Sequence, residues 1–288
     1  MRLSPYLKIF PHPAKPGWCV LFSTRKGSLA LLPETAVQTL KAGQTLSEQE
    51  MAALAKIGFI TDDPRAEKAL VLGMLEEVNR LSTALNVAVI LTLDCNFACR
   101  YCYEGTQKNK RYMTEETAAQ LVEFLKSRFK PGHKKLTLAF YGGEPLLAKE
   151  QIKQISGPLR EFVEKQGAEF YFTLVTNGSL LNRPMVEELT PFGLRSAKVT
   201  LDGPAELHNQ SRPFRSGQGS FAAIVKNVRE CCELLQIGIQ GNCTRDNYQR
   251  FPELLDLLER KGIGPDRLLM VLFGPVLQTS DEFALAEF

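Results

Sequence analysis

The sequence has 288 residues, of which 44% are hydrophobic and 23% are charged, enough to build one large domain with or without a smaller one. The net charge is only +3 and the basic residues are dispersed, so a nucleic-acid partner is not expected. No apolar run is long enough to cross a bilayer and the N-terminus lacks the pattern of a secretory signal, so no membrane association and a cytoplasmic location are expected.

Residues 1–63 predict a small α+β domain. Strands are expected at three short alternating runs, residues 6–10, 18–22 and 29–32. Two helices are expected at 34–41 and 47–57, the second with Ser47 as its N-cap. Residues 64–85 should then form a linker helix, because an amphipathic helical pattern covers most of them.

From residue 86 to residue 288 we expect a second domain, in which strands and helices alternate. The expected strands are 87–93, 136–141, 170–175, 197–201, 237–242 and 268–273. The expected helices between them are 114–129, 149–165, 184–189, 220–235 and 251–261. This alternation predicts an α/β fold with a parallel sheet, and six strands fit a partial (β/α)6 TIM-like barrel. Ligands are then expected at the carboxyl ends of the strands.

Three of the seven cysteines, Cys95, Cys99 and Cys102, follow the first barrel strand with the spacing C-x3-C-x2-C. Thiolates are the preferred ligands of iron–sulfur clusters, and this crowding does not resemble a disulfide framework, so a reducing compartment is expected. Three cysteines on a [4Fe-4S] cube leave one iron open for a substrate or cofactor. The nearest alternative is structural zinc, which needs four ligands, usually in C-x2-C pairs, and no second pair follows. Three buried, unligated cysteines are the other alternative.

The cysteine segment, with an aromatic residue before its last cysteine, resembles the signature of the radical S-adenosylmethionine (AdoMet) superfamily. Other motifs of that family follow in order: Y-G-G-E-P at 141–145, T-N-G at 176–178, and L-D-G-P at 201–204 with His208, Asn209 and Arg212 after it. The resemblance implies a [4Fe-4S] cluster on the three cysteines, which are then the catalytic and metal-binding residues. It also implies that AdoMet binds the open iron and is cleaved by one electron to methionine and a 5′-deoxyadenosyl radical.

By the same resemblance, the AdoMet-binding residues would be Tyr101, Gly142, Gly143, Glu144, Thr176, Asn177, Asp202 and Arg212. The two glycines would let the backbone approach a ligand closely, and Glu144 would accept hydrogen bonds from the methionine ammonium. Thr176 and Asn177 could reach a ribose or a carboxylate, although Asn-Gly is also a turn signal. Asp202 and Arg212 could instead face the substrate or form a structural ion pair.

Two aromatic residues beside the cysteines have expected roles: Tyr101 packs against the adenine and Phe97 shields the cluster. The four other cysteines fit buried apolar positions: Cys19, Cys231, Cys232 and Cys243. His12 and His133 stand alone in the sequence and are expected in surface loops.

The segment 201–212 and the N-terminal domain are similar to the branch of the family that modifies ribosomally made peptides, with a weaker likeness to geopeptide-type maturases. By this resemblance, a winged-helix-like N-terminal domain would bind a precursor peptide as an added strand. The reaction would be hydrogen abstraction from that peptide, with thioether formation as one outcome, and reduced flavodoxin or ferredoxin would supply the electron. The alternative for residues 1–63 is a purely structural extension.

Two other functions stay open from the sequence. One is the oxidation of a Cys or Ser in a protein, as in anaerobic sulfatase-maturating enzymes, and the other is a non-catalytic, peptide-binding iron–sulfur protein. A molybdopterin-precursor cyclase is less expected, because GTP would favour more arginines near the barrel mouth. Many relatives carry a cysteine-rich C-terminal domain, called SPASM. No cysteine follows Cys243 and the apolar end at 284–288 lacks a capping signal, so we expect a further segment to be missing.

Overall fold

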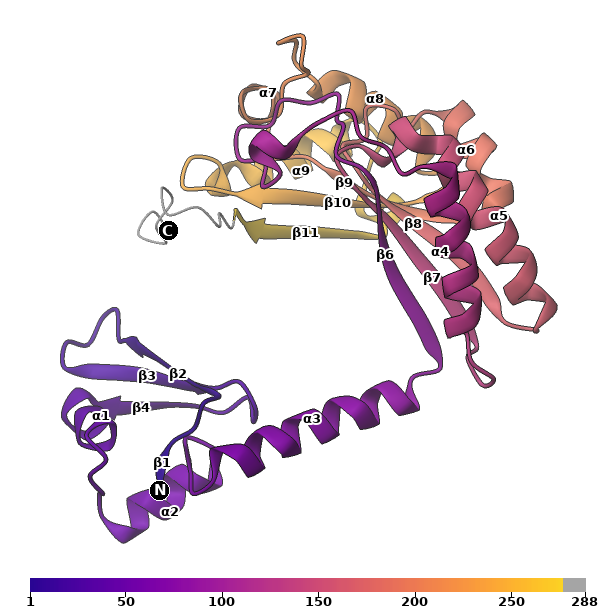
Figure 1. Cartoon of the computed structure of the whole chain (residues 1–288). Coiled ribbons are helices and arrows are strands. Elements are labelled where there is room, and N and C mark those ends of the chain that lie inside the picture. Colours follow the sequence, from indigo (N-terminus) through magenta and orange to yellow (C-terminus); the bar gives the residue numbers. More distant parts are fainter. Residues whose placement is uncertain (277–288) are drawn as a thin grey trace. The chain divides into compact units, whose positions relative to one another are not determined.

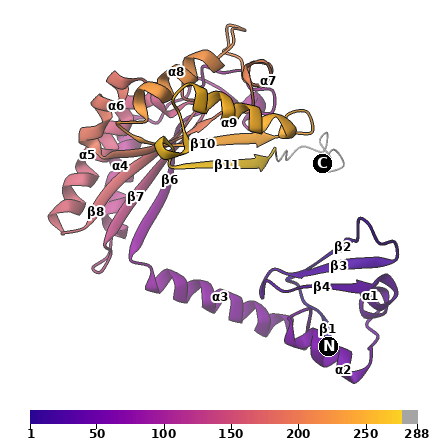
Figure 2. The ribbon, with the colours of Figure 1, turned by 180° about the vertical axis from the view of Figure 1, so that it is seen from behind.

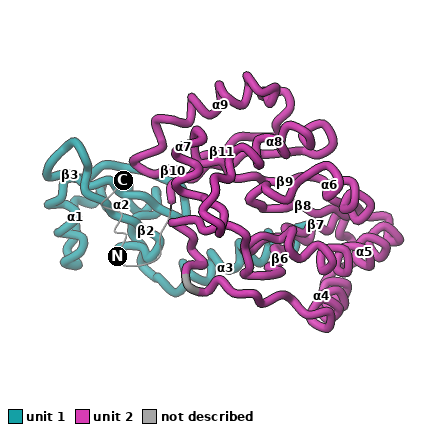
Figure 3. The backbone as a smooth tube through the Cα atoms, turned by 90° about the horizontal axis from the view of Figure 1, so that it is seen from above, with its two compact units in different colours: residues 1–82 teal, residues 83–288 magenta. Residues whose placement is uncertain are grey.

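The computed structural model describes residues 1–276, except for the side chain of Thr106, and the chain divides into two compact units, Met1–Ser82 and Thr83–Phe288 (Figure 3). The linker helix expected at 64–85 is α3 (Pro64–Leu81), which belongs to the first unit. The chain end at 284–288 lies outside the described residues. No helix among the described residues is long and apolar enough to cross a membrane.

The first unit contains a three-stranded antiparallel sheet in the order β2-β3-β4 (Figure 1). Its strands are β2 (Leu7–Pro11), β3 (Trp18–Ser23) and β4 (Leu29–Pro33), and a second pair joins β1 (Arg2–Leu3) to β5 (Ile60–Thr61). The helices are α1 (Glu34–Lys41), α2 (Glu48–Lys56) and α3. Ser47 caps α2 in a capping box with Glu50, and Leu21 and Phe59 are fully buried in a small core. The unit is therefore an α+β fold with its own core.

The second unit is built on a six-stranded parallel sheet in the order β11-β10-β9-β8-β7-β6. The strands are β6 (Ala84–Thr92), β7 (Lys135–Gly142), β8 (Glu169–Thr176), β9 (Leu194–Thr200), β10 (Gln236–Cys243) and β11 (Met270–Pro275). Neighbours in the sheet are also neighbours in the chain, and in residues 1–276 β6 and β11 do not pair with each other, so the sheet is open between them. This is the partial (β/α)6 TIM-like barrel predicted from the sequence.

Helices follow the strands and lie on one face of the sheet (Figures 1 and 2). They are α4 (Glu115–Arg128), α5 (Lys149–Lys165), α6 (Arg183–Leu189), α7 (Ala205–Ser211), α8 (Phe221–Cys231) and α9 (Phe251–Arg260). Short 3-10 turns are η1 (Gly105–Gln107), η2 (Pro145–Ala148), η3 (Thr190–Phe192), η4 (Tyr248–Arg250) and η5 (Pro265–Arg267). The helix expected at 220–235 ends at Cys231, because residues 232–235 turn into β10.

The alternation of side chains along the strands explains why only one face is covered. Leu138 and Phe140 on β7 and Phe172 on β8 are fully buried, whereas Ala139 and Thr173 between them are half-buried on the opposite face. The apolar residues bury themselves against the helices. The opposite, concave face carries the smaller and more polar residues, which leaves room for a cavity.

The isolated cysteines and histidines only partly match their expected positions. Cys19 and Cys231 are buried, as expected, but Cys232 and Cys243 are half-buried because they lie at the ends of α8 and β10. His12 and His133 lie outside the helices and strands.

Phe172 offers a test of the core, because its ring packs edge-on against Phe140 with centroids 5.2 Å apart. We expect Phe172→Ala to lower the free energy of unfolding by about 3–5 kcal/mol, through lost burial and an unfilled cavity. Phe124, which is 53% exposed, is the matched control, and Phe124→Ala should cost less than about 1 kcal/mol. Urea denaturation followed by circular dichroism measures both, and equal losses would contradict this assignment of the core.

Candidate active site

A cavity of about 330 Å³ lies at the carboxyl ends of the barrel strands. Nine of the residues expected in the site line it: Cys95, Cys99, Tyr101, Cys102, Gly142, Gly143, Thr176, Asn177 and Arg212. The expected residues Glu144 and Asp202 do not line it. Its position follows from the topology, since parallel strands bring their carboxyl ends to one edge of the sheet.

The cysteine loop is anchored at its start by Asp94, which comes two residues after the end of β6 and is almost fully buried. One carboxylate oxygen accepts hydrogen bonds from the Cys95 backbone N–H at 3.0 Å and from Arg215 at 2.9 Å, and the other accepts from the Tyr112 hydroxyl at 2.8 Å. Further along, the backbone N–H of Arg100 donates to the Ser211 carbonyl at 3.0 Å. The loop is therefore fixed before any ligand binds.

The three thiols of this loop are free, and burial works against the ionisation of two of them, Cys95 and Cys99. Burial raises the pKa of Cys95 to about 11 and also raises the pKa of Cys99, although the positive charge of Arg212 partly offsets the latter shift. Such thiols become thiolates when a bound metal centre supplies positive charge. The loop is therefore suited to hold a metal centre, and the neutral thiols are poorly suited to act as free nucleophiles.

The arrangement of the thiols favours an iron–sulfur cluster over a single metal ion. Among the described residues, no three His, Cys, Asp or Glu side chains converge closely enough to hold one metal ion. Instead, the three cysteines share a cavity much larger than a zinc ion needs. The donor set of three sulfurs around a wide cavity fits a [4Fe-4S] cluster with room for a further ligand.

Gly142 and Gly143 are required by a close approach of two backbone segments. A Cβ on Gly143 would lie 2.1 Å from the Asp94 carbonyl oxygen, and one on Gly142 would lie 2.5 Å from the Thr92 carbonyl oxygen. Gly142 also has a φ of +121°, which L-residues rarely adopt. The turn after β7 therefore packs directly on the cysteine loop, which is a reason for glycine at both positions in addition to the expected approach of a ligand.

Glu144 is fully buried and its carboxylate is occupied within the protein. It accepts hydrogen bonds from the Thr176 hydroxyl at 2.8 Å, the Asn177 backbone N–H at 2.8 Å and the Leu146 backbone N–H at 3.1 Å. Burial raises the pKa of Glu144, while these hydrogen bonds lower it. Since the carboxylate joins the ends of β7 and β8 and does not line the cavity, its geometry favours a structural role.

Asn177 faces the first cysteine. Its side-chain amide donates to the Asn96 side chain at 2.8 Å and lies 3.8 Å from the Cys95 sulfur. Hydrogen bonds to cluster sulfurs are one of the means by which proteins adjust iron–sulfur centres. The placement of Asn177 thus suits contact with a cluster ligand as well as the expected contact with AdoMet.

The Tyr101 hydroxyl ties the cysteine loop to the opposite side of the barrel. It accepts hydrogen bonds from Arg212 at 2.7 Å and from the Asn242 side chain at 2.9 Å, and it donates to Asp202 in a short hydrogen bond. Burial raises the pKa of Tyr101, so the hydroxyl keeps its proton for Asp202. Asp202 acts through Tyr101 and does not line the cavity, which favours a positioning role.

His208 completes this side of the site. Its Nδ1 accepts from the Asp202 backbone N–H at 3.2 Å, so the ring proton is on Nε2, 3.0 Å from the Ser220 hydroxyl. Ser220 in turn donates to the Arg212 carbonyl at 2.7 Å. Burial lowers the pKa of His208 to about 3, so the ring is neutral at pH 7 and serves as a fixed link between two turns.

Several residues that line the cavity were not predicted: Tyr103, Glu104, Lys108, Tyr141, Val175, Lys198, Thr200, Gln240 and Asn242. Lys198 on β9 and Gln240 on β10 each follow a buried apolar residue of the same strand. Because successive side chains of a strand point to opposite faces, this alternation could have placed both on the concave face. Glu104 comes two residues after Cys102 in an irregular loop, where no periodic signal exists.

The sequence family described as the Radical SAM superfamily matches residues 89–258. Fe-coproporphyrin III synthase of Methanosarcina barkeri is 29% identical over 60% of this chain and 40% of that protein. GTP 3′,8-cyclase of Helicobacter pylori is 36% identical over 65% of this chain and 54% of that protein. The chain thus spans about half the length of these curated relatives.

A similar fold occurs in the solved structure of native anSMEcpe with bound AdoMet and the Cp18Cys peptide. The two chains are 22% identical and superpose with a TM-score of 0.57 over 68% of this chain and 52% of that chain. This likeness supports the barrel described above.

Gly143→Ala tests the close approach of the turn to the cysteine loop. The added methyl group must displace the Asp94 backbone, so we expect the free energy of unfolding to fall by about 1–3 kcal/mol. Gly274→Ala is the matched control, because a Cβ there meets nothing within 4 Å. Denaturant titration of both variants decides the point, and an unchanged stability of Gly143→Ala would rule out the packing described here.

The buried His208 predicts a dependence of stability on pH. Its folded pKa of about 3 lies below the ordinary value of 6.5, so the unfolded chain binds one more proton than the folded chain between these limits. The free energy of unfolding should therefore fall as the pH drops from about 6.5 towards 3, by up to about 1.4 kcal/mol per pH unit from this residue. The proton NMR signal of the His208 ring should stay unshifted between pH 5 and 8, and a titration in that range would refute the neutral ring.

Proposed function

The chain belongs to the radical SAM superfamily, whose enzymes use a [4Fe-4S] cluster and AdoMet, and we propose that it modifies a peptide by hydrogen abstraction. The observation that carries the proposal is the set of three free thiols around one cavity at the carboxyl edge of the sheet. In this proposal Cys95, Cys99 and Cys102 hold the cluster. The remaining cavity walls then receive AdoMet and the reacting part of the substrate.

The bound cluster and AdoMet supply a single electron and a carbon radical that abstracts hydrogen. The protein's own contribution is placement. The Tyr101 hydroxyl holds the cysteine loop against the turn after β9, through Asp202, and against β10, through Asn242. Arg212 donates to the same hydroxyl, and Asn177 presents its amide beside Cys95. Phe97 is fully buried and packs edge-on against Phe214 with centroids 4.9 Å apart, which keeps water from that side of the loop.

A peptide substrate is supported by the first unit. In the described part of the chain, β2 and β4 pair only with β3, so each leaves one strand edge open. An extended peptide can add to such an edge through backbone hydrogen bonds. The structure of anSMEcpe with a bound peptide adds support, since its barrel is similar to this one. Reduced flavodoxin or ferredoxin is the proposed electron donor, and thioether formation is one proposed outcome.

The test is anaerobic. Protein reconstituted with iron and sulfide, reduced and given AdoMet should release 5′-deoxyadenosine, detected by mass spectrometry. Cys99→Ala should reduce the product below detection, because it removes one of the three cluster ligands. The matched control is Cys232→Ser, which removes a half-buried thiol at the end of α8 and should retain the product. Product in Cys99→Ala, or none in the wild-type protein with a complete cluster, would overturn the proposal.

The substrate is tested in the same reaction. Co-expression with a candidate precursor peptide, followed by mass spectrometry of that peptide, should show a mass change that depends on Cys99. GTP serves as the competing substrate, because a relative with 36% identity is a GTP 3′,8-cyclase. Conversion of GTP with no change in any peptide would contradict a peptide substrate and indicate a nucleotide substrate.

A further inference from the structure

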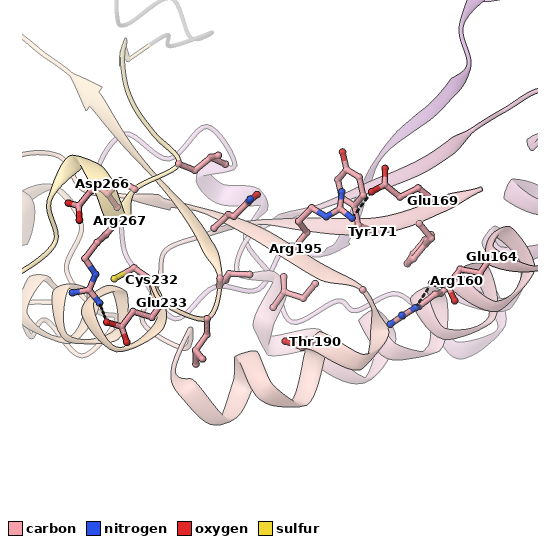
Figure 4. Close-up of a pocket in the computed structure, with 18 residues that line it drawn as sticks. Arg160, Glu164, Glu169, Tyr171, Thr190, Arg195, Cys232, Glu233, Asp266 and Arg267 are labelled. Carbon is pink, nitrogen blue, oxygen red and sulfur yellow. Dashed lines mark hydrogen bonds and ion pairs between the residues drawn. The ribbon is translucent and has the colours of Figure 1, made fainter. Parts of the chain in front are cut away.

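Most carboxylates near the two hollows of the second unit already have partners. The larger hollow, of about 900 Å³, lies at the amino ends of the strands and is shown in Figure 4. There Glu169 pairs with Arg195, Glu164 with Arg160, and Glu233 with Arg267, at 2.6, 2.8 and 2.8 Å. These charges satisfy one another, so that hollow offers little to a ligand.

Around the cysteine cavity, Glu144 is occupied by three donors and Asp94 is occupied by Arg215 and Tyr112. Neither residue lines the cavity. Among the described residues that do line it, Glu104 carries the only carboxylate. The carboxylate available to a ligand is therefore that of Glu104.

Glu104 is only 6% exposed, and its Oε2 has no hydrogen-bond partner among the described residues. Its Oε1 lies 3.4 Å from the Tyr103 hydroxyl, which is too long for a strong hydrogen bond. The positive charge of Lys108 acts on Glu104, but the Lys108 ammonium donates to the Phe97 carbonyl at 3.3 Å. A buried carboxylate oxygen without a donor is costly, and such a group is explained when a ligand supplies the donor.

The surroundings of Glu104 favour a cation over a neutral donor. Tyr103 and Tyr141 also line the cavity, and their rings are nearly parallel, with centroids 6.2 Å apart and planes at 13°. The faces of aromatic rings attract cations, and hydrogen bonds between an ammonium and a carboxylate are stronger than those between neutral groups. Ammonium is therefore the chemistry that fits the three residues together.

We propose that Glu104, which lines the cavity together with Tyr103 and Tyr141, binds a primary ammonium group there. The inference rests on the proposed function, because that function brings AdoMet, which carries such a group, to this site. The ammonium of the methionine part of AdoMet is one source and an amine of the substrate is the other. In the first case, Glu104 takes the role that the sequence motif suggested for Glu144.

The experiment measures binding of three nucleosides to reconstituted protein by equilibrium dialysis. AdoMet and S-adenosylhomocysteine carry the ammonium, whereas 5′-deoxy-5′-methylthioadenosine lacks the whole amino-acid part. Glu104→Gln keeps the shape of the side chain but removes its charge. We expect it to weaken the first two ligands about tenfold or more and to leave the third unchanged. Glu115→Gln, which alters an exposed carboxylate at the start of α4, is the control and should change none of them.

A second measurement tests an amine of the substrate as the source of the ammonium. If each of the three nucleosides binds the wild-type protein and Glu104→Gln equally, the ammonium belongs to the substrate. Nα-acetyl-lysine methylamide should then bind the wild-type protein in the presence of AdoMet, and Glu104→Gln should lose that binding. Saturation-transfer NMR measures both. Equal weakening of all three nucleosides would mean a damaged pocket and would overturn the proposal, as would no change with any probe. A wild-type protein that binds no AdoMet would instead count against the proposed function.

Discussion

The buried carboxylate of Glu144 is the interaction on which the cavity depends. It holds the carboxyl ends of β7 and β8 together through Thr176 and Asn177, so these ends cannot separate without leaving a buried carboxylate unpaired. The preceding Gly143 has no side chain and lets the cysteine loop lie directly on the same turn. One short segment therefore fixes two strand ends and the position of Cys95 at once.

The opposite side of the loop is held by a chain of polar groups. Tyr101 reaches from between two cysteines to Asp202, and His208 locks the turn that carries Asp202. Arg212 compensates the negative charge there and has a buried Nε without a partner among the described residues. Because both sides are fixed in advance, little reorganisation is needed when a cofactor binds, and a site held in place before binding positions its ligands more precisely.

The sequence predicted the fold well because its signals are local. The bounds of α1 and α5 match the prediction, and the six barrel strands lie within a few residues of it, since strand and helix periods differ clearly. The two-residue strands β1 and β5 were missed because they are too short to show a period, and the seven-residue α7 was missed because it has no side-chain N-cap, unlike the equally short α6 with Asn182. In the site, the motifs located the cysteines and Gly143. They could not show that Glu144 is occupied, because its partner Asn177 lies 33 residues away in the chain.

The distribution of charge around the cavity limits what the site can bind. Its walls carry one carboxylate, that of Glu104, and three cations, Lys108, Lys198 and Arg212. The half-buried Lys198 lies on the concave face, and its neighbours on the adjacent strands, Val175 and Gly238, are uncharged. A ligand with both an ammonium and a carboxylate, such as an amino acid or the methionine part of AdoMet, matches this pattern better than a ligand with one sign of charge. The barrel is shared by enzymes of many activities, so the selectivity of this cavity for the reacting group depends on these inward-facing side chains and not on the fold.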